Sequence, residues 1–211
     1  MSDRPTDGDM KIEYLHASKF GNGAIVAAEF REQMAVKGVD VDVHHVRELR
    51  PSKLPSADLY VFSSPGRFGK PIGVARRFLQ QVELPAGTLY AVLTTEAASK
   101  PDRKTGRMPT EEELAKYQRV RPIINEILQG KGLVKVAEDK VHVTRLKGPL
   151  EEGWQETVAD FVARLPFFGD AAASPSVAGG AERGLDGPLS QPSSSCARLP
   201  GSIESLREMR T

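Results

Sequence analysis

The residues Leu59–Ser63 read LYVFS, which is apolar at four of five positions and lacks the alternation of a strand with one wet face. A second stretch of this kind, TLYAVLTT, follows at Thr88–Thr95. Between the two, Gly73–Gln81 has the length of a short helix. Strands that are apolar on both faces are typical of parallel sheets, whose crossover helices cover both sides. The two stretches are therefore predicted to be central strands of one parallel sheet.

The segments on either side continue the alternation of strand and helix. Val39–Val46 alternates valine with aspartate and histidine, which indicates a half-exposed strand. Thr110 and Glu113 form a capping box, and Pro122 is expected to kink or restart the helix that begins there. The other predicted strands are Lys11–His16, Val39–Val46 and Val134–Val143, and the other predicted helices are Gly23–Lys37, 110–130 and Leu150–Leu165.

Five strands joined by helices predict an α/β fold, a doubly wound parallel five-stranded sheet. The half-exposed second strand belongs at an edge and the two apolar strands at the centre, and the order 2-1-3-4-5 satisfies both demands. In such a sheet a ligand binds at the carboxyl ends of the strands, where the strand order switches. The candidate site therefore lies in the loops that follow His16, Ser63 and Thr94.

Each of these loops has residues suited to a ligand, although each could also be an ordinary turn. The first has two glycines before a helix, which presents backbone N–H groups to an anion. The second places an aromatic and a cationic side chain after a buried strand, which suits a flat heteroaromatic ring. The third offers hydroxyls and small residues. The candidate residues are Ser18, Lys19, Phe20, Gly21, Asn22 and Gly23, then Ser64, Pro65, Gly66, Arg67, Phe68 and Gly69, then Thr94, Thr95, Glu96 and Ala97.

Composition narrows the classes of function. The chain has 29 Lys and Arg against 28 Asp and Glu, so no basic excess points to nucleic acid. The single cysteine, Cys196, excludes an internal disulfide framework. No apolar run is long enough to span a bilayer, and the polar start does not resemble a secretory signal, so a cytoplasmic protein without membrane contact is expected.

The two ends are predicted to lie outside the folded domain. Residues 1–9 are polar, and residues 169–211 are rich in Gly, Pro and Ser without any aromatic residue. Such segments bury too little apolar surface to offset the loss of chain entropy. We therefore expect a disordered N-terminus, a domain over residues 10–168 and a disordered tail.

Three motifs in residues 10–165 resemble the flavodoxin superfamily. Ala17–Gly23 is similar to the loop that holds the FMN phosphate, Ser64–Gly69 to the loop along the isoalloxazine ring, and Arg77–Gln81 to the segment after it. The resemblance is greatest to flavodoxin-domain proteins and to tryptophan-repressor-binding-type NAD(P)H:quinone oxidoreductases. It implies a flavodoxin-like fold, FMN as cofactor, and electron transfer with a redox partner or NAD(P)H; it leaves homodimerisation open.

The sequence departs from that pattern at two positions. Phe20 and Gly23 stand where flavodoxins have hydroxyls that bind the phosphate. Each lost contact to a charged group is worth about 1.5–3 kcal/mol, so a scaffold without flavin that serves as a binding or regulatory module is the alternative.

The remaining polar features are a basic insert and two adjacent histidines. A basic insert, Ala97–Thr110, is interpreted as a mobile surface loop or a docking segment for an acidic partner or the phosphates of NAD(P)H. His44 and His45 are adjacent on a strand, so they cannot chelate one metal, and no metal site is predicted.

Overall fold

The computed structural model describes residues 10–102, 104–145 and 147–166 of the chain. Its main sheet has five parallel strands in the order β2-β1-β3-β6-β7, which confirms the predicted order 2-1-3-4-5. The tail predicted at 169–211 and the N-terminus predicted at 1–9 lie outside the described residues. The strands are β1 (Lys11–His16), β2 (Asp40–His45), β3 (Leu59–Ser63), β6 (Leu89–Ala97) and β7 (Val134–Val143).

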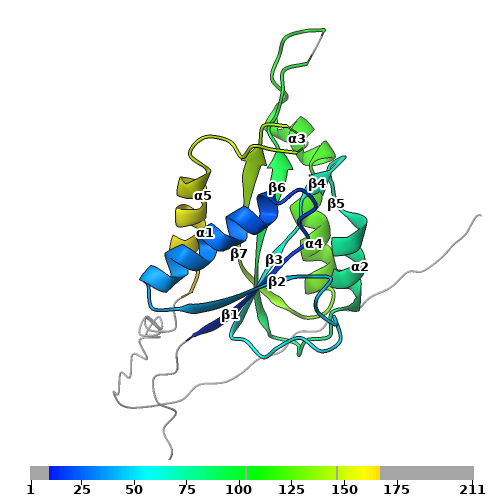
Figure 1. The fold of residues 1–211 in the computed structure, drawn as a ribbon. Helices are drawn as coiled ribbons and strands as arrows, with labels where there is room; N and C mark the ends of the chain where they lie inside the picture. The colour runs from blue at the N-terminus through cyan, green and yellow to red at the C-terminus, as the bar shows by residue number, and fades with distance from the viewer. Residues whose placement is uncertain (1–9, 103, 146, 167–211) are drawn as a thin grey trace, which may run out of the picture. The chain divides into compact units, whose positions relative to one another are not determined.

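Helices cover the sheet on both faces (Figure 1). Helices α1 and α5 pack on one face, and α2 and α4 pack on the other. None of the described helices is both long and apolar enough to cross a membrane. The helices are α1 (Asn22–Val36), α2 (Gly73–Gln81), α3 (Glu111–Tyr117), α4 (Val120–Gln129) and α5 (Trp154–Ala163).

The two central strands are buried on both faces, as their sequences predict. In β3, Val61 belongs to the core under α1 and α5, whereas Phe62 belongs to the core under α2 and α4. On the first face Tyr14 and Phe30 pack with ring centroids 5.1 Å apart. On the second face Phe62 and Tyr90 lie 6.4 Å apart. Burial of such side chains contributes about 1.5–3 kcal/mol each, so this double coverage is the main source of stability.

The edge strand and the helix boundaries show smaller differences from the sequence predictions. In β2, Val41 is buried and Asp40 is exposed, which confirms the predicted half-exposed edge. The capping box of Thr110 and Glu113 is present, and α4 restarts two residues before Pro122. Proline is tolerated there because the first turn of a helix has free N–H groups anyway. Helix α5 begins only at Trp154, after Gly153 with φ of 77°.

A two-stranded hairpin between β3 and α2 was not predicted from the sequence. It consists of β4 (Gly66–Arg67) and β5 (Lys70–Pro71), and its tip contains Phe68 and Gly69, both with positive φ. The Gly69 carbonyl accepts a hydrogen bond of 2.7 Å from the Arg119 N–H. A Cβ atom at Gly66 would lie 2.8 Å from Val120 Cγ2. The hairpin is therefore closely packed against the start of α4, and glycine is required for the approach.

Substituting Gly69 tests this packing. A Cβ atom there would overlap the carbonyl oxygen of Tyr117, and the backbone has φ of 70°. We expect Gly69→Ala to lower the free energy of unfolding by at least about 2–3 kcal/mol in urea denaturation. Gly87→Ala is the matched control, because Gly87 has φ of 87° and open space around it, so only about 1 kcal/mol of backbone strain is expected. Equal losses in the two variants would show that the hairpin does not need close approach.

Candidate functional site: a cavity at the ends of β1 and β3

A cavity of about 680 Å³ opens at the carboxyl ends of β1, β2 and β3. This volume is within the range of about 300–1,000 Å³ that small-molecule sites have. The cavity lies at the edge of the sheet where a doubly wound fold binds its ligand. Its wall consists of Ala17–Phe20 after β1, His45 and Arg47 at the end of β2, and Pro65–Phe68 together with Pro71–Val74 between β3 and α2.

The turn after β1 is organised around the hydroxyl of Ser18. Its Oγ accepts hydrogen bonds from the N–H groups of Gly21, at 3.1 Å, and Gly23, at 3.2 Å. A Cβ atom at Gly23 would lie 3.2 Å from the Cβ of Ser18, so the close approach favours glycine. Gly21 caps α1 in the left-handed conformation, with φ of 90°. Both glycines therefore have local structural roles, and their amides are already engaged.

Other backbone amides remain available around the cavity. The N–H groups of Lys19 and Phe20 in the cavity wall, and of Asn22 two residues further along the turn, have no hydrogen-bond acceptor among the described residues. Helix α2 also begins at the cavity wall, where Gly73 and Val74 precede the first helical hydrogen bond. Free N–H groups and the positive end of the helix dipole favour an anion.

The side chains of the wall add positive charge and apolar surface. Lys19, Arg47 and Arg67 line the cavity, and no carboxylate of the described residues does. Phe20 is 43% exposed and lies under the Lys19 ammonium at 5.4 Å, so it forms part of the wall and leaves the cavity open. Phe68, which is predicted to shield one face of a bound ring, lines the cavity from the hairpin tip and is 90% exposed, so its shielding role stays a prediction.

Two histidines support the turn after β1. The Nε2 of His45 lies 3.2 Å from the Ser18 carbonyl oxygen, and the Nδ1 of His16 accepts from the Ser18 N–H at 3.4 Å. The two rings meet edge to face with centroids 5.1 Å apart. Burial lowers the pKa of His16, the neighbouring His45 lowers it further, and Glu48 opposes the shift. The folded chain therefore disfavours protonation of His16.

The lowered pKa of His16 predicts acid sensitivity. In the unfolded chain a histidine has a pKa of about 6.5, so it binds a proton more readily there than in the folded chain. The contribution of His16 to the free energy of unfolding is therefore complete above that pH and is lost as the pH falls through the folded pKa. We expect the free energy of unfolding to fall as the pH drops below about 6.5, and to fall less in His16→Asn, whose Oδ1 can replace the Nδ1 acceptor. Urea denaturation at several pH values measures both slopes. Parallel slopes would contradict the assignment.

The third predicted loop is a continuation of strand β6. Thr94, Thr95 and Glu96 are strand residues with at most 3% of their surface exposed, and none of them lines the cavity. The Thr95 N–H donates to the Ser64 carbonyl at 3.3 Å. The predicted loop over Thr94–Ala97 is instead strand, because this segment pairs with β7 as far as Ala97, and its contact with a ligand stays a prediction.

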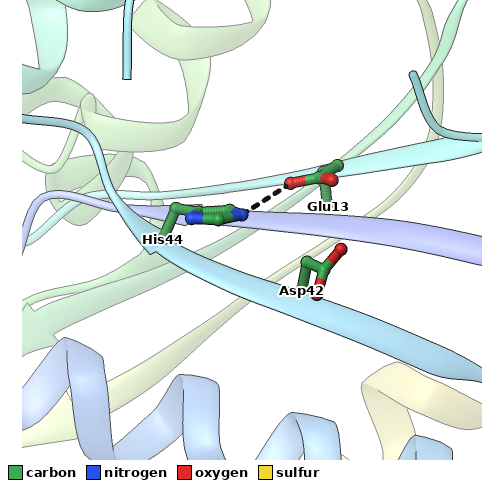
Figure 2. A group of neighbouring side chains, drawn as sticks. All are labelled: Glu13, Asp42 and His44. Carbon is green, nitrogen blue, oxygen red and sulfur yellow. Dashed lines mark ion pairs between the residues drawn. The ribbon is translucent and has the colours of Figure 1, made fainter. Parts of the chain in front are cut away.

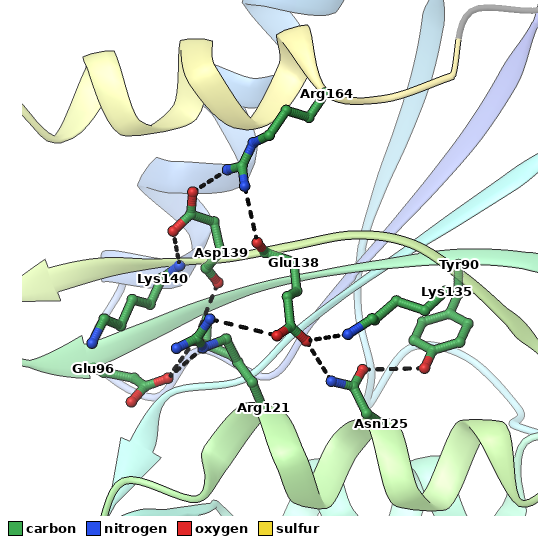
Figure 3. A network of polar contacts seen from close by, with 10 residues as sticks. Tyr90, Glu96, Arg121, Asn125, Lys135, Glu138, Asp139, Lys140 and Arg164 are labelled. Atoms are coloured by element: carbon green, nitrogen blue, oxygen red, sulfur yellow. Dashed lines mark hydrogen bonds and ion pairs between the residues drawn. The ribbon is translucent and has the colours of Figure 1, made fainter. Parts of the chain in front are cut away.

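Glu96 belongs to a polar network between β6, α4 and β7 (Figure 3). Its Oε1 accepts from Thr94 Oγ1 at 2.7 Å and lies 3.6 Å from Arg121 Nε. Arg121 also lies 3.8 Å from the Glu138 carboxylate. Burial disfavours the charge of Glu138, but donors from Asn125 and Lys135 outweigh it and hold its pKa below the usual value. Sequence patterns do not predict this network, because it joins residues that are far apart in the chain.

Removing Arg121 tests the network. Arg121→Leu leaves the Glu96 carboxylate buried without its cation, and we expect a loss of about 2 kcal/mol in the free energy of unfolding, limited by the partial exposure of Arg121. In a Glu96→Gln background the same substitution should cost clearly less, because no buried charge is left unpaired. Additive losses in urea denaturation would show that the two residues do not interact.

The basic insert has internal structure in its described part. The Asp102 carboxylate accepts from the N–H groups of Lys104 and Thr105 and from the Thr105 hydroxyl, which lowers its pKa. Arg107 pairs with Glu113 at 2.7 Å. The insert projects beyond the carboxyl edge of the sheet (Figure 1). Its role as a docking segment stays a prediction.

No protein-family model and no curated protein sequence matches the chain. Solved structures do match. Flavodoxin 1 and Flavodoxin 2 from Bacillus cereus are 19% and 18% identical, each with a TM-score of 0.53 over 73% of this chain and over 95% and 96% of theirs.

The rubredoxin oxygen:oxidoreductase from Desulfovibrio gigas is 14% identical, with a TM-score of 0.54 over 73% of this chain. This chain spans only about a third (34%) of that protein. At these identities the matches establish the fold. With its five-stranded parallel sheet and its strand order, the chain has a flavodoxin-like fold.

Proposed function

We propose that this chain binds FMN in the cavity at the ends of β1 and β3. The proposal rests on the lining of this cavity of about 680 Å³, where free backbone amides, three cationic side chains and apolar surface lie together. A phosphate requires the first two of these features and a flat ring requires the third. The flavodoxin-like fold supports the same ligand.

The residues present suit the two ends of such a molecule. The amides of Lys19, Phe20 and Asn22, together with the Lys19 ammonium, would hold the phosphate. Phe20, Pro65 and Ile72 offer apolar contacts to a ring, and Arg67 can neutralise negative charge beside it. In this arrangement the chain orients the ligand and excludes water, and FMN would supply the electron chemistry. A redox partner or NAD(P)H as the electron source is part of the same proposal.

Titration of the full chain with FMN tests the proposal. We expect saturable quenching of flavin fluorescence, and weaker binding of riboflavin, which lacks the phosphate. Arg67→Ala should weaken FMN binding by about tenfold, since a charge-assisted contact is worth about 1.5–3 kcal/mol. Arg31→Ala, an exposed cation on α1, is the matched control and should leave binding unchanged. Failure of FMN to saturate the wild-type chain would refute the proposal.

One observation favours the second candidate, a flavin-free binding module. The Ser18 hydroxyl already satisfies the amides of Gly21 and Gly23, so two donors that a phosphate could use are engaged. A module of this kind would bind inorganic phosphate or a phosphorylated ligand without a flavin ring. Binding of phosphate that FMN does not compete for would favour this candidate over the first.

A further inference from the structure

A cluster of three metal-ligating side chains lies on the other half of the sheet from β6, between β1 and the edge strand β2 (Figure 2). Glu13 comes from β1, and Asp42 and His44 come from β2. The parallel register pairs Glu13 with Asp42 and Leu15 with His44, so all three side chains project from the face covered by α2 and α4. One ligand atom from each lies within 4.8 Å of the other two.

Glu13 is the unusual member of this cluster. Its side chain is fully buried, yet neither carboxylate oxygen has a hydrogen-bond partner. A buried carboxylate without compensation costs several kcal/mol, so such groups are normally paired or bind metals. The pairing here is incomplete: His44 Nε2 lies 3.2 Å from one oxygen and Lys11 Nζ lies 3.4 Å from the other. Tyr60, which pairs with Glu13 from the neighbouring strand β3, donates its hydroxyl to the Pro55 carbonyl and makes no hydrogen bond with Glu13.

The spacing suits a small tetrahedral cation. Two ligands on one Zn²⁺ with bonds of about 2.0–2.1 Å lie about 3.3 Å apart. The Glu13 and His44 atoms are already at 3.2 Å, and a carboxylate oxygen of the half-exposed Asp42 lies within 4.8 Å of both. Imidazole with two carboxylates favours a transition metal over Mg²⁺ or Ca²⁺, which prefer oxygen ligands alone.

The Lys11 ammonium occupies the position in the cluster where a cation is favoured. Its Nζ lies 3.4 Å from Glu13 and 3.3 Å from Asp42, between the two carboxylates. Its side chain is 43% exposed, so the ammonium can move into solvent without being buried elsewhere. The side chains of His44 and His45 lie on opposite faces of the sheet, as predicted, because His44 meets Glu13 and His45 meets His16; only His44 can therefore belong to this cluster.

We propose that Glu13, Asp42 and His44 bind one Zn²⁺ ion, which displaces the Lys11 ammonium. A water molecule would complete the tetrahedron on the exposed side, next to Asp42. The site would fasten the edge strand β2 to β1. It lies outside the wall of the cavity at the strand ends and is independent of any ligand there.

Calorimetric titration of the tag-free full chain with Zn²⁺ tests this site. We expect one ion per chain with a dissociation constant below about 100 μM, and no comparable binding of Mg²⁺. Glu13→Gln, Asp42→Asn and His44→Asn should each weaken the binding of Zn²⁺ at least about tenfold. Asp42→Asn changes a half-exposed residue, so it keeps the test valid if Glu13→Gln does not fold.

Two further variants separate this site from adventitious binding. Lys11→Met removes the competing ammonium and should bind Zn²⁺ about threefold more tightly or better. His142→Asn is the matched control, because His142 and Glu151 form a similar pair at 3.0 Å without a second carboxylate, and its affinity should equal that of the wild type. The proposal fails if the wild type shows no one-to-one binding, if Asp42→Asn and His44→Asn bind as tightly as the wild type, or if Lys11→Met binds no more tightly.

Discussion

The fold depends on the burial of β3 and β6 on both faces. Val61 and Phe62 are neighbours in the chain but belong to different hydrophobic cores, and Ala91 and Val92 repeat the arrangement in β6. A strand with two apolar faces is stable only when helices cover both sides, and parallel strands with crossover helices provide that cover. The positions of α1, α2, α4 and α5 follow from this one requirement.

The same requirement positions the candidate site. Parallel strands bring their carboxyl ends to one edge, so the turn at Ser18 and the loop after Ser63 must lie close together. The cavity forms where β2, β1 and β3 end, and the cations of three separate segments meet there. On the opposite side, β6 runs on to Ala97 paired with β7, and the Glu96 carboxylate lies 3.6 Å from Arg121.

The buried polar residues near the two edges of the sheet differ in how many hydrogen bonds they make. Glu138, Asn125 and Lys135 form a connected network in which the carboxylate has several donors. Glu13 has no hydrogen-bond donor, only the Lys11 ammonium and the His44 imidazole at salt-bridge distance. A buried network is favourable when every member is satisfied, and the incomplete one at β1 and β2 is where the proposed Zn²⁺ would replace the Lys11 ammonium.

The sequence alone determined the fold class, the strand order and the general location of the candidate site, because apolar runs, alternation and capping signals such as Thr110 with Glu113 are local. Tertiary structure alone decided that strand β6 runs beyond Thr95 to Ala97 and that Glu13 meets His44. These depend on register and on contacts between residues far apart in the chain. Local sequence patterns do not show which hydrogen-bonding groups are occupied by a neighbouring strand. The details of the site therefore depend on the folded molecule.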